Sequence, residues 1–253
     1  MHSHILFNSH IGQTKRSETI ENSPACPFCN RDMLEEILDE DGSIALVKNK
    51  YPVLENTFQT VLIETDDCFS ELSLYPKEHL YKVIRFGIRH WLQMIHSGDY
   101  SSVLFFKNHG PYSGGTIRHP HMQIVGLKTY DYHNCVSEDQ FEGIMIDESA
   151  GVEFNLSTKP RVGFFEFNVV MEDQKNIERF ADYLQCAAHY VLNHYHASCT
   201  SYNMFFYEWN RTIAAKIMPR FVTSPLYVGY AIPQISNRIS EIADLVRCTY
   251  FKP

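Results

Sequence analysis

Two long amphipathic segments, each flanked by short β-like runs, constrain most strongly what this chain can fold into. Residues 76–96 and 176–194 carry apolar side chains in steps of three and four, which is the spacing of one helical face. The β-like runs are 44–48, 60–64, 103–106, 122–125, 163–170, 202–207, 214–218 and 226–231, and a last helix is expected over 236–246. The order of strands, then a long helix, then further strands is thus expected twice along the chain. This order predicts an α+β fold with a mainly antiparallel sheet and long helices.

The same order divides the chain into an arm and two halves. Residues 1–24 are polar and end in Asn-Ser-Pro, so we expect an N-terminal arm there. We expect one half over 25–145 and a second over 146–253. Because no clean sequence repeat links them, the halves are expected to be pseudo-repeated only.

The balance of charge argues against some partners. Lys and Arg number 22 against 30 Asp and Glu, a formal net charge of −8, whereas a general nucleic-acid binder needs a positive field along the phosphate backbone. No stretch approaches ~18 consecutive apolar residues, and no basic segment followed by an apolar core opens the chain. We therefore expect neither nucleic acid nor a membrane as partner.

The cysteine count indicates a compartment. Seven cysteines are an odd number and are not dense for 253 residues. Without a secretory signal, they fit thiols or metal ligands in a reducing environment better than a disulfide framework. We therefore expect the protein in the cytoplasm.

Cys26 and Cys29 form a Cys-x-x-Cys pair, the first candidate for chemistry. Two thiolates at this spacing can bind one tetrahedral metal ion, which then needs two further ligands from elsewhere in the chain. A redox pair is a second interpretation, although that motif usually lies between a strand and a long helix. Two buried thiols in a turn are the third.

A second candidate lies at residues 108–123, where a Gly-rich loop leads into His119-Pro120-His121-Met122-Gln123. The pair Gly114-Gly115 lets the backbone approach a ligand, and its amides can face phosphate oxygens. In a strand entered at His119, the side chains of His119, His121 and Gln123 share one face. A neutral imidazole can attack phosphorus and form a phosphoramidate that a second substrate discharges. An ordinary strand with two half-exposed histidines is the simpler interpretation, but the preceding loop favours function.

These motifs resemble the galactose-1-phosphate uridylyltransferase branch of the histidine-triad (HIT) superfamily, and within it short bacterial members. The resemblance rests on the Cys-x-x-Cys pair, an Asn-x-Gly segment, the Ser/Gly-rich loop and His-Pro-His-x-Gln. It covers residues 26–127 well and extends more faintly to about 230. It implies a HIT-like fold, with the motifs in the first half and a degenerate HIT-like second half.

The resemblance also implies roles for the motif residues. His121 would be the nucleophile that carries a nucleoside monophosphate, Gln123 would hold the phosphoryl group, and the main-chain carbonyl of His119 would orient the neutral tautomer of His121. His119 matches a metal ligand in zinc-bearing members, and Cys68 lies where their fourth ligand, a histidine, is expected. The expected site is therefore a closed Cys₃His zinc, Cys26, Cys29, Cys68 and His119, whose role is structural. His79 is the alternative to Cys68.

Substrate contacts follow from the same resemblance. Asn49 and Tyr51 match the segment that lines base and ribose. Asn108, Ser113, Gly115 and Thr116 match the loop on the phosphate side. The second-half histidines of the long enzymes are replaced by Ala214 and Lys216, so a second metal site is expected to be lost. Lys216 could offer its charge to an anionic substrate, or it could be a strand lysine whose stem packs on apolar surface.

The expected function is nucleotidyl transfer. A UMP-type nucleoside monophosphate would move between phosphate-bearing substrates, such as nucleotide sugars and sugar phosphates, through a covalent nucleotidyl-histidine. Three alternatives stay open: a nucleotide-sugar or dinucleotide phosphorylase, a hydrolase, and a zinc-stabilised nucleotide-binding protein without turnover. The resemblance also admits a homodimer, because members of the family often dimerise.

Overall fold

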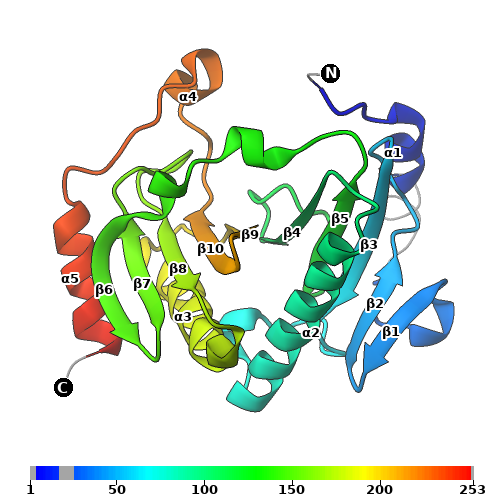
Figure 1. The fold of residues 1–253 in the computed structure, drawn as a ribbon, viewed down its shortest axis with the longest axis horizontal. Coiled ribbons are helices and arrows are strands. Elements are labelled where there is room, and N and C mark those ends of the chain that lie inside the picture. The colour runs from blue at the N-terminus through cyan, green and yellow to red at the C-terminus, as the bar shows by residue number, and fades with distance from the viewer. Residues whose placement is uncertain (1–3, 17–25, 252–253) are drawn as a thin grey trace. The chain divides into compact units, whose positions relative to one another are not determined.

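The computed structural model describes residues 4–16 and 26–251, and these form two compact units (Figure 1). The first unit comprises Met1–Glu71, Arg85–Phe106 and Ile117–Cys135, and the second comprises Leu72–Ile84, Lys107–Thr116 and Val136–Pro253. Each unit is built on its own run of strands. Among the described residues, no helix combines the length and the apolar character needed to cross a bilayer.

The first unit contains strands β1 (Ile37–Asp41), β2 (Ile44–Lys48), β3 (Thr57–Ile63), β5 (His121–Leu127) and most of β4 (Ser102–His109). They are ordered β1-β2-β3-β5-β4, and the pairs β1–β2, β2–β3 and β3–β5 are antiparallel. The register places Ala45 opposite Ile63, and Ile63 opposite His121. Because opposed residues share a face, this register fixes which side of the sheet carries His121.

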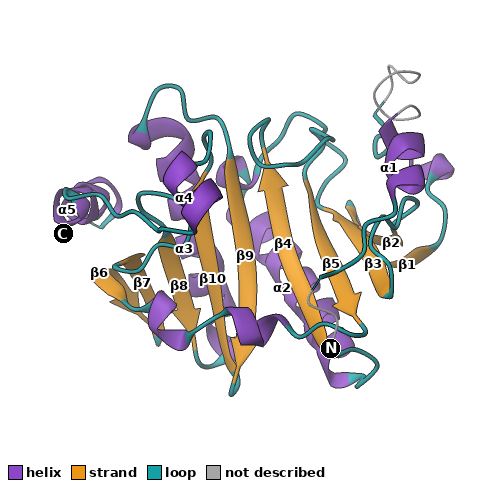
Figure 2. Ribbon diagram, turned by 90° about the horizontal axis from the view of Figure 1, so that it is seen from above, coloured by secondary structure: helices purple, strands orange, loops and turns teal. Residues whose placement is uncertain are grey.

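The two faces of this sheet are covered differently. The part of helix α2 (Lys77–His96) that belongs to this unit, from Arg85 on, lies along one face (Figure 2), where Gly87 allows close approach: a Cβ there would lie 2.6 Å from the Phe105 ring and 3.2 Å from Leu62. The opposite face carries a small apolar cluster against which Phe28 and Leu34 pack. The members of that cluster are Ala45, Val47, Val61 and Ile63. His121 is therefore on the face opposite α2.

The second unit contains strands ordered β9-β10-β8-β7-β6, all in antiparallel pairs. Their bounds are β6 (Gly143–Ser149), β7 (Val152–Ser157), β8 (Phe167–Met171), β9 (Tyr202–Trp209) and β10 (Thr212–Pro219). The helices are α3 (Ile177–Tyr190), α4 (Pro225–Tyr230) and α5 (Ile239–Tyr250), and a π-helical turn (Val191–Tyr195) extends α3. Helix α5 lies alongside β6 (Figure 1), where the Arg247 guanidinium donates to the Met145 carbonyl.

The predicted α+β class with mainly antiparallel strands is confirmed. One predicted strand, 226–231, is wrong, because residues 226–230 belong to helix α4 and Ala231 follows its end. Its start is specified locally: Ser224 caps it by accepting from the Leu226 N–H at 3.3 Å, and Pro225 occupies the first helical turn. The helix α1 (Ser9–Arg16), in the stretch expected to be an irregular arm, was not predicted.

Candidate functional site

Four potential metal ligands converge in the first unit. Cys26 and Cys29 lie in a turn closed by a hydrogen bond from the Cys29 N–H to the Cys26 carbonyl at 3.2 Å. Cys68 comes from the loop after β3, and His119 lies two residues before the start of β5. One ligand atom from each residue lies within 4.8 Å of the other three. The structure brings together the four residues expected from the sequence, including Cys68 and not the alternative His79.

The His119 ring is held in one tautomer. Its Nε2 lies 2.7 Å from the Thr65 carbonyl oxygen, which can only accept, so Nε2 must carry the hydrogen. In the neutral ring, the lone pair is then on Nδ1, which lies 3.5 Å from the Sγ atoms of both Cys26 and Cys29. A metal-ligating histidine is commonly oriented by a carbonyl on its other nitrogen. The geometry around His119 is of that kind.

The donor set fits a zinc ion. Three thiols and one imidazole are ligands that Zn²⁺ prefers, and thiolates around one tetrahedral zinc lie ~3.8 Å apart. Burial together with the neighbouring Cys29 and Cys26 thiols raises the pKa of Cys68 to about 12. Cation binding would therefore have to displace protons from the sulfurs. Four protein ligands leave no open position, so such an ion would be structural.

Arg31 connects the two chain segments that supply the cysteines. Its Nε donates to Asp66 Oδ1 at 2.9 Å, and its guanidinium also contacts the Ser43 carbonyl. Asp66 lies two residues before Cys68, so the ion pair holds the Cys68 loop next to the Cys-x-x-Cys turn. The sequence analysis missed Arg31, because nothing in its spacing from Asp66 indicates the contact.

His121 is the first residue of β5 and is 8% exposed. Its Nδ1 lies 2.7 Å from the carbonyl oxygen of His119, as expected from the resemblance. Because that carbonyl only accepts, Nδ1 carries the hydrogen and the lone pair of the neutral ring is on Nε2. The Phe28 ring stands edge-on to both imidazoles, with centroid distances of 5.8 Å to His119 and 5.4 Å to His121. Phe28 is a further site residue that the sequence did not single out.

Gln123 lies on the same face of the first unit's sheet as His121, and Asn49 follows the row of paired residues that contains Val125. Gln123 is two residues along β5 from His121, so it shares that face by strand alternation. The Asn49 N–H donates to the Gln59 carbonyl at 2.8 Å, and Gln59 pairs with Val125, four residues along β5 from His121. At the rise of a strand, four residues span about 13 Å. Because Asn49 follows β2, it lies about 13 Å from His121 along the strands and also two strands away across the sheet, at ~4.8 Å per strand.

Tyr51 is fixed beside Asn49 by a local turn. The Asn49 Oδ1 accepts from the Tyr51 N–H at 2.9 Å, which is an Asx-type turn. The Tyr51 ring is half-buried, and the Lys50 ammonium lies 5.7 Å from its centroid. A half-buried aromatic ring is a side chain on which a base can stack.

The Gly-rich loop belongs to the second unit and is organised by Asn203. The Asn203 amide donates to Asn108 Oδ1 at 2.6 Å and to the Ser113 carbonyl at 2.9 Å. Ser113 Oγ donates to the Gly110 carbonyl at 2.7 Å and accepts from the Gly115 N–H at 3.3 Å. The Gly115 amide thus has an internal partner, and Thr116 follows as the last residue of the loop segment.

The position of Lys216 corrects its expected role. Its side chain is fully buried in the second unit, and Nζ lies 2.8 Å from Asn168 Oδ1 and 3.2 Å from Glu166 Oε2. The other Glu166 oxygen accepts from the N–H groups of Arg161 and Val162 at 2.8 and 2.9 Å. Burial lowers the pKa of Lys216, and the Glu166 carboxylate opposes that shift. The expectation that Lys216 binds an anionic substrate is therefore wrong.

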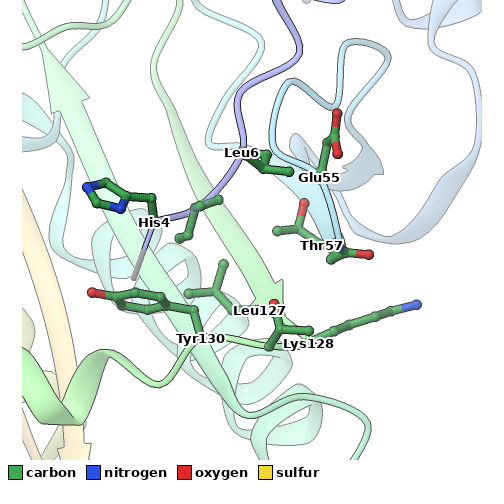
Figure 3. A pocket seen from close by; sticks show the side chains of 10 residues that line it. His4, Leu6, Glu55, Thr57, Leu127, Lys128 and Tyr130 are labelled. Carbon is green, nitrogen blue, oxygen red and sulfur yellow. The ribbon is translucent and has the colours of Figure 1, made fainter. Parts of the chain in front are cut away.

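A small cavity elsewhere in the first unit is not a substrate site. It lies between the N-terminal segment and the ends of β3 and β5, next to His4, Thr57 and Tyr130 (Figure 3). Its volume of about 40 Å³ suits one or two water molecules. A nucleotide needs a site several times larger.

Solved structures of low sequence identity share this fold. A uridylyltransferase aligns over 90% of this chain and 92% of its own, with 14% identity and a TM-score of 0.71. An ADP-glucose phosphorylase from Arabidopsis thaliana, with bound ADP-glucose, aligns over 94% of each chain at 16% identity and a TM-score of 0.72. The fold expected from the resemblance is thus confirmed. No curated protein matches the sequence.

Matches of higher sequence identity or to family models come from one family, which has an N-terminal and a C-terminal domain. The crystal structure of a DUF4931 family protein from Bacillus cereus ATCC 10987 is 45% identical, covers 86% of this chain and 100% of its own, and has a TM-score of 0.79. The model of the DUF4931 N-terminal domain of unknown function matches residues 7–130, and that of the C-terminal domain matches residues 133–251. The chain therefore belongs to the DUF4931 family.

Proposed function

We propose that this protein is a nucleotidyltransferase that moves a nucleoside monophosphate between phosphate-bearing substrates through a covalent bond to His121. The carrying observation is the 2.7 Å contact from His121 Nδ1 to the His119 carbonyl. It leaves the lone pair on Nε2, which is the nitrogen that would attack phosphorus. The uridylyltransferase and the ADP-glucose phosphorylase of the same fold act, by their names, on nucleotide-bearing substrates, which agrees with this proposal.

The reaction has two displacements. In the first, Nε2 attacks the α-phosphorus of a nucleoside diphosphate sugar, a nitrogen–phosphorus bond forms, and the bond to the leaving sugar phosphate breaks. In the second, a phosphate oxygen of the acceptor attacks the same phosphorus and restores the imidazole. The His119 carbonyl stabilises the ring while it carries positive charge, because Nδ1–H remains hydrogen-bonded throughout.

Other residues of the first unit would bind and orient the nucleotide. The Gln123 amide, on the face of His121, would donate to a phosphoryl oxygen. Asn49 and Tyr51, about 13 Å along the strands, would take the ribose and base. Cys26, Cys29, Cys68 and His119 would hold a structural zinc ion, whose contribution is to fix the segments flanking His121. Asn108, Ser113, Gly115 and Thr116 are proposed for the phosphate side.

Trapping the covalent intermediate tests the proposal. Full-length protein is incubated with UDP-glucose or ADP-glucose labelled at the α-phosphate, and the label is followed through acid and base treatment. We expect an acid-labile, base-stable adduct that maps to His121 and is absent from His121→Ala. His133→Ala, which removes an exposed histidine paired with Asp131, is the matched control and should label normally. Nucleotide binding without any adduct would instead favour a binding protein.

The acceptor is identified in the same experiment. Galactose 1-phosphate, inorganic phosphate or water is added to the labelled protein. Release as a nucleotide sugar indicates a transferase, release as a nucleoside diphosphate a phosphorylase, and release as a nucleoside monophosphate a hydrolase. We expect discharge to a phosphate-bearing acceptor, because Gln123 cannot activate water by taking its proton.

A further inference from the structure

Solvent reaches the three thiols of the proposed zinc site unequally. Cys29 is exposed, whereas Cys26 and Cys68 are only partly exposed. A small oxidant dissolved in water therefore meets the Cys29 sulfur first. Oxidation of a cysteine depends on its exposure and on its thiolate character, and a bound metal ion keeps its cysteine ligands as thiolates. Cys29 meets both conditions once the site holds its ion.

Cys26 is the thiol placed to react with an oxidised Cys29. The hydrogen bond from the Cys29 N–H to the Cys26 carbonyl at 3.2 Å closes a four-residue turn. Such a turn keeps its first and last Cα atoms less than ~7 Å apart, and the Cα atoms of a disulfide lie ~4.4–6.8 Å apart. Both Sγ atoms are 3.5 Å from His119 Nδ1 and within 4.8 Å of each other. A disulfide between them therefore requires little movement of the backbone.

We infer that Cys29 and Cys26 form an oxidation site, at which hydrogen peroxide produces a disulfide and the metal is released. In the first step, the Cys29 sulfur attacks a peroxide oxygen, the O–O bond breaks, and a sulfenic acid and a hydroxide ion result. In the second step, the Cys26 thiolate attacks the Cys29 sulfur, the S–S bond forms, and the S–O bond breaks to release a second hydroxide. Two thiolates thus lose two electrons, and the peroxide gains them and takes up two protons to become two water molecules.

The disulfide removes half of the ligand set. Cys68 and His119 remain, whereas a structural zinc ion is held by four protein ligands. The His119 ring keeps the Thr65 carbonyl on Nε2 but no longer faces two thiolates with Nδ1. Because the carbonyl of the same residue lies 2.7 Å from His121 Nδ1, the change reaches the proposed nucleophile. The effect on His121 rests on the proposed function, whereas disulfide formation and metal release do not.

Oxidation of the zinc-loaded, full-length protein tests the inference. The protein is treated with hydrogen peroxide, free zinc is followed with a chelating dye, and disulfides are mapped by mass spectrometry of peptides. We expect about one zinc ion per chain to be released as the Cys26–Cys29 disulfide forms. A dithiol reductant with added zinc should reverse both changes. Cys135→Ser, at an exposed cysteine outside the cluster, is the matched control and should release zinc as the parent does.

The order of events is measured with dimedone, which reacts with sulfenic acids. When it is present during oxidation, we expect it to mark Cys29 before Cys26 or Cys68. Earlier marking of either of the other two would overturn the role given to Cys29. Zinc that stays bound while the exposed Cys135 is oxidised in the same sample would exclude the site, as would a protein that takes up no zinc on loading. Release of zinc with a disulfide to Cys68 would exclude the assigned pair.

The labelling of His121 is followed separately on the same samples. We expect the oxidised, zinc-free protein to form the adduct at least ~10-fold more slowly than the untreated protein, and reduction with zinc to restore the rate. An adduct that forms equally fast in both would refute the link from the cluster to the nucleophile. Absence of any adduct in the untreated protein would instead count against the proposed function, while the disulfide and the released zinc still decide the oxidation site.

Discussion

Cys68 supplies one of the four ligand atoms of the proposed zinc site and lies on a different chain segment from the other three. We expect Cys68→Ser to reduce bound zinc from about one per chain to a small fraction, because a neutral hydroxyl is a poor ligand for Zn²⁺. Metal analysis of the purified protein measures the change. Cys135→Ser, at an exposed cysteine outside the cluster, is the control and should retain the metal. Full zinc occupancy in Cys68→Ser would exclude Cys68 as a ligand.

The buried pair of Lys216 and Glu166 makes a prediction about stability. Removing one charge leaves the other buried and uncompensated, so we expect Lys216→Met to lower the free energy of unfolding by about 3–5 kcal/mol. The double variant Lys216→Met/Glu166→Gln should recover a large part of that loss, because no unpaired charge remains. Urea denaturation of the three proteins measures the difference. Equal losses in the single and double variants would contradict the argument.

At the scale of single residues, the sequence predicted contacts within one motif better than contacts between distant segments. The hydrogen bond from His121 to the His119 carbonyl was foreseen, because it joins two residues of one motif that are two positions apart. The Arg31–Asp66 pair was not, because it links two loops 35 positions apart. Lys216 was expected to offer its charge to a substrate, because its ion-pair partner Glu166 lies 50 positions away, on a segment that sequence alone does not bring close.

The loop that precedes the histidine motif depends on close backbone approach at Gly110. Its φ is +82°, and a Cβ there would lie 2.1 Å from the Thr200 carbonyl oxygen. Gly98 has a similar φ of +75° but nothing within 4 Å of its Cβ position. We expect Gly98→Ala to cost about 1 kcal/mol of stability and Gly110→Ala at least about 2 kcal/mol more, because the loop must move as well. Thermal unfolding of both variants measures the contrast, and equal costs would refute the steric part of the argument.

Elements with a buried face were predicted well, and edge elements were not. The helix expected over 76–96 is Lys77–His96, and the run 44–48 is strand β2. Strands β1 and β6 end the strand orders of their units, β1 is largely exposed and β6 has one buried residue, so no clear alternation of buried and exposed residues marks them. The acidic residues of β1 also oppose pairing with another chain, which is a common property of sheet edges. Helix α4 was misassigned because its residues are apolar and were taken for a buried strand, whereas none of them is buried in the structure.

For the whole molecule, removal of zinc from the proposed site is expected to lower the stability of the fold. We expect a strong chelator to lower the melting temperature by on the order of 10 °C, because metal binding contributes directly to folding. Calorimetry before and after chelation, with zinc added back, measures the effect. A melting temperature unchanged by chelation, in protein shown to have lost its zinc, would exclude a structural role.

The sequence predicted two halves, but it did not indicate which internal stretches each compact unit takes. The expected first half was one continuous stretch, 25–145, whereas residues 72–84 and 107–116 belong to the second unit. The Asn203 amide donates hydrogen bonds to Asn108 and Ser113 in the stretch 107–116. The Gln185 amide donates to the Leu72 and Tyr75 carbonyls in the stretch 72–84. Neither amide has a periodicity or a motif that would reveal such a contact in advance.

His119 acts through its side chain and its main chain at once. The ring presents Nδ1 to the sulfurs, while the carbonyl of the same residue holds the His121 ring. Under the proposed function, loss of an ion held by the His119 ring would thus reach the His121 ring through a handful of covalent bonds. We expect a zinc-starved cell to contain protein that no longer forms the adduct at His121, although most of its fold persists.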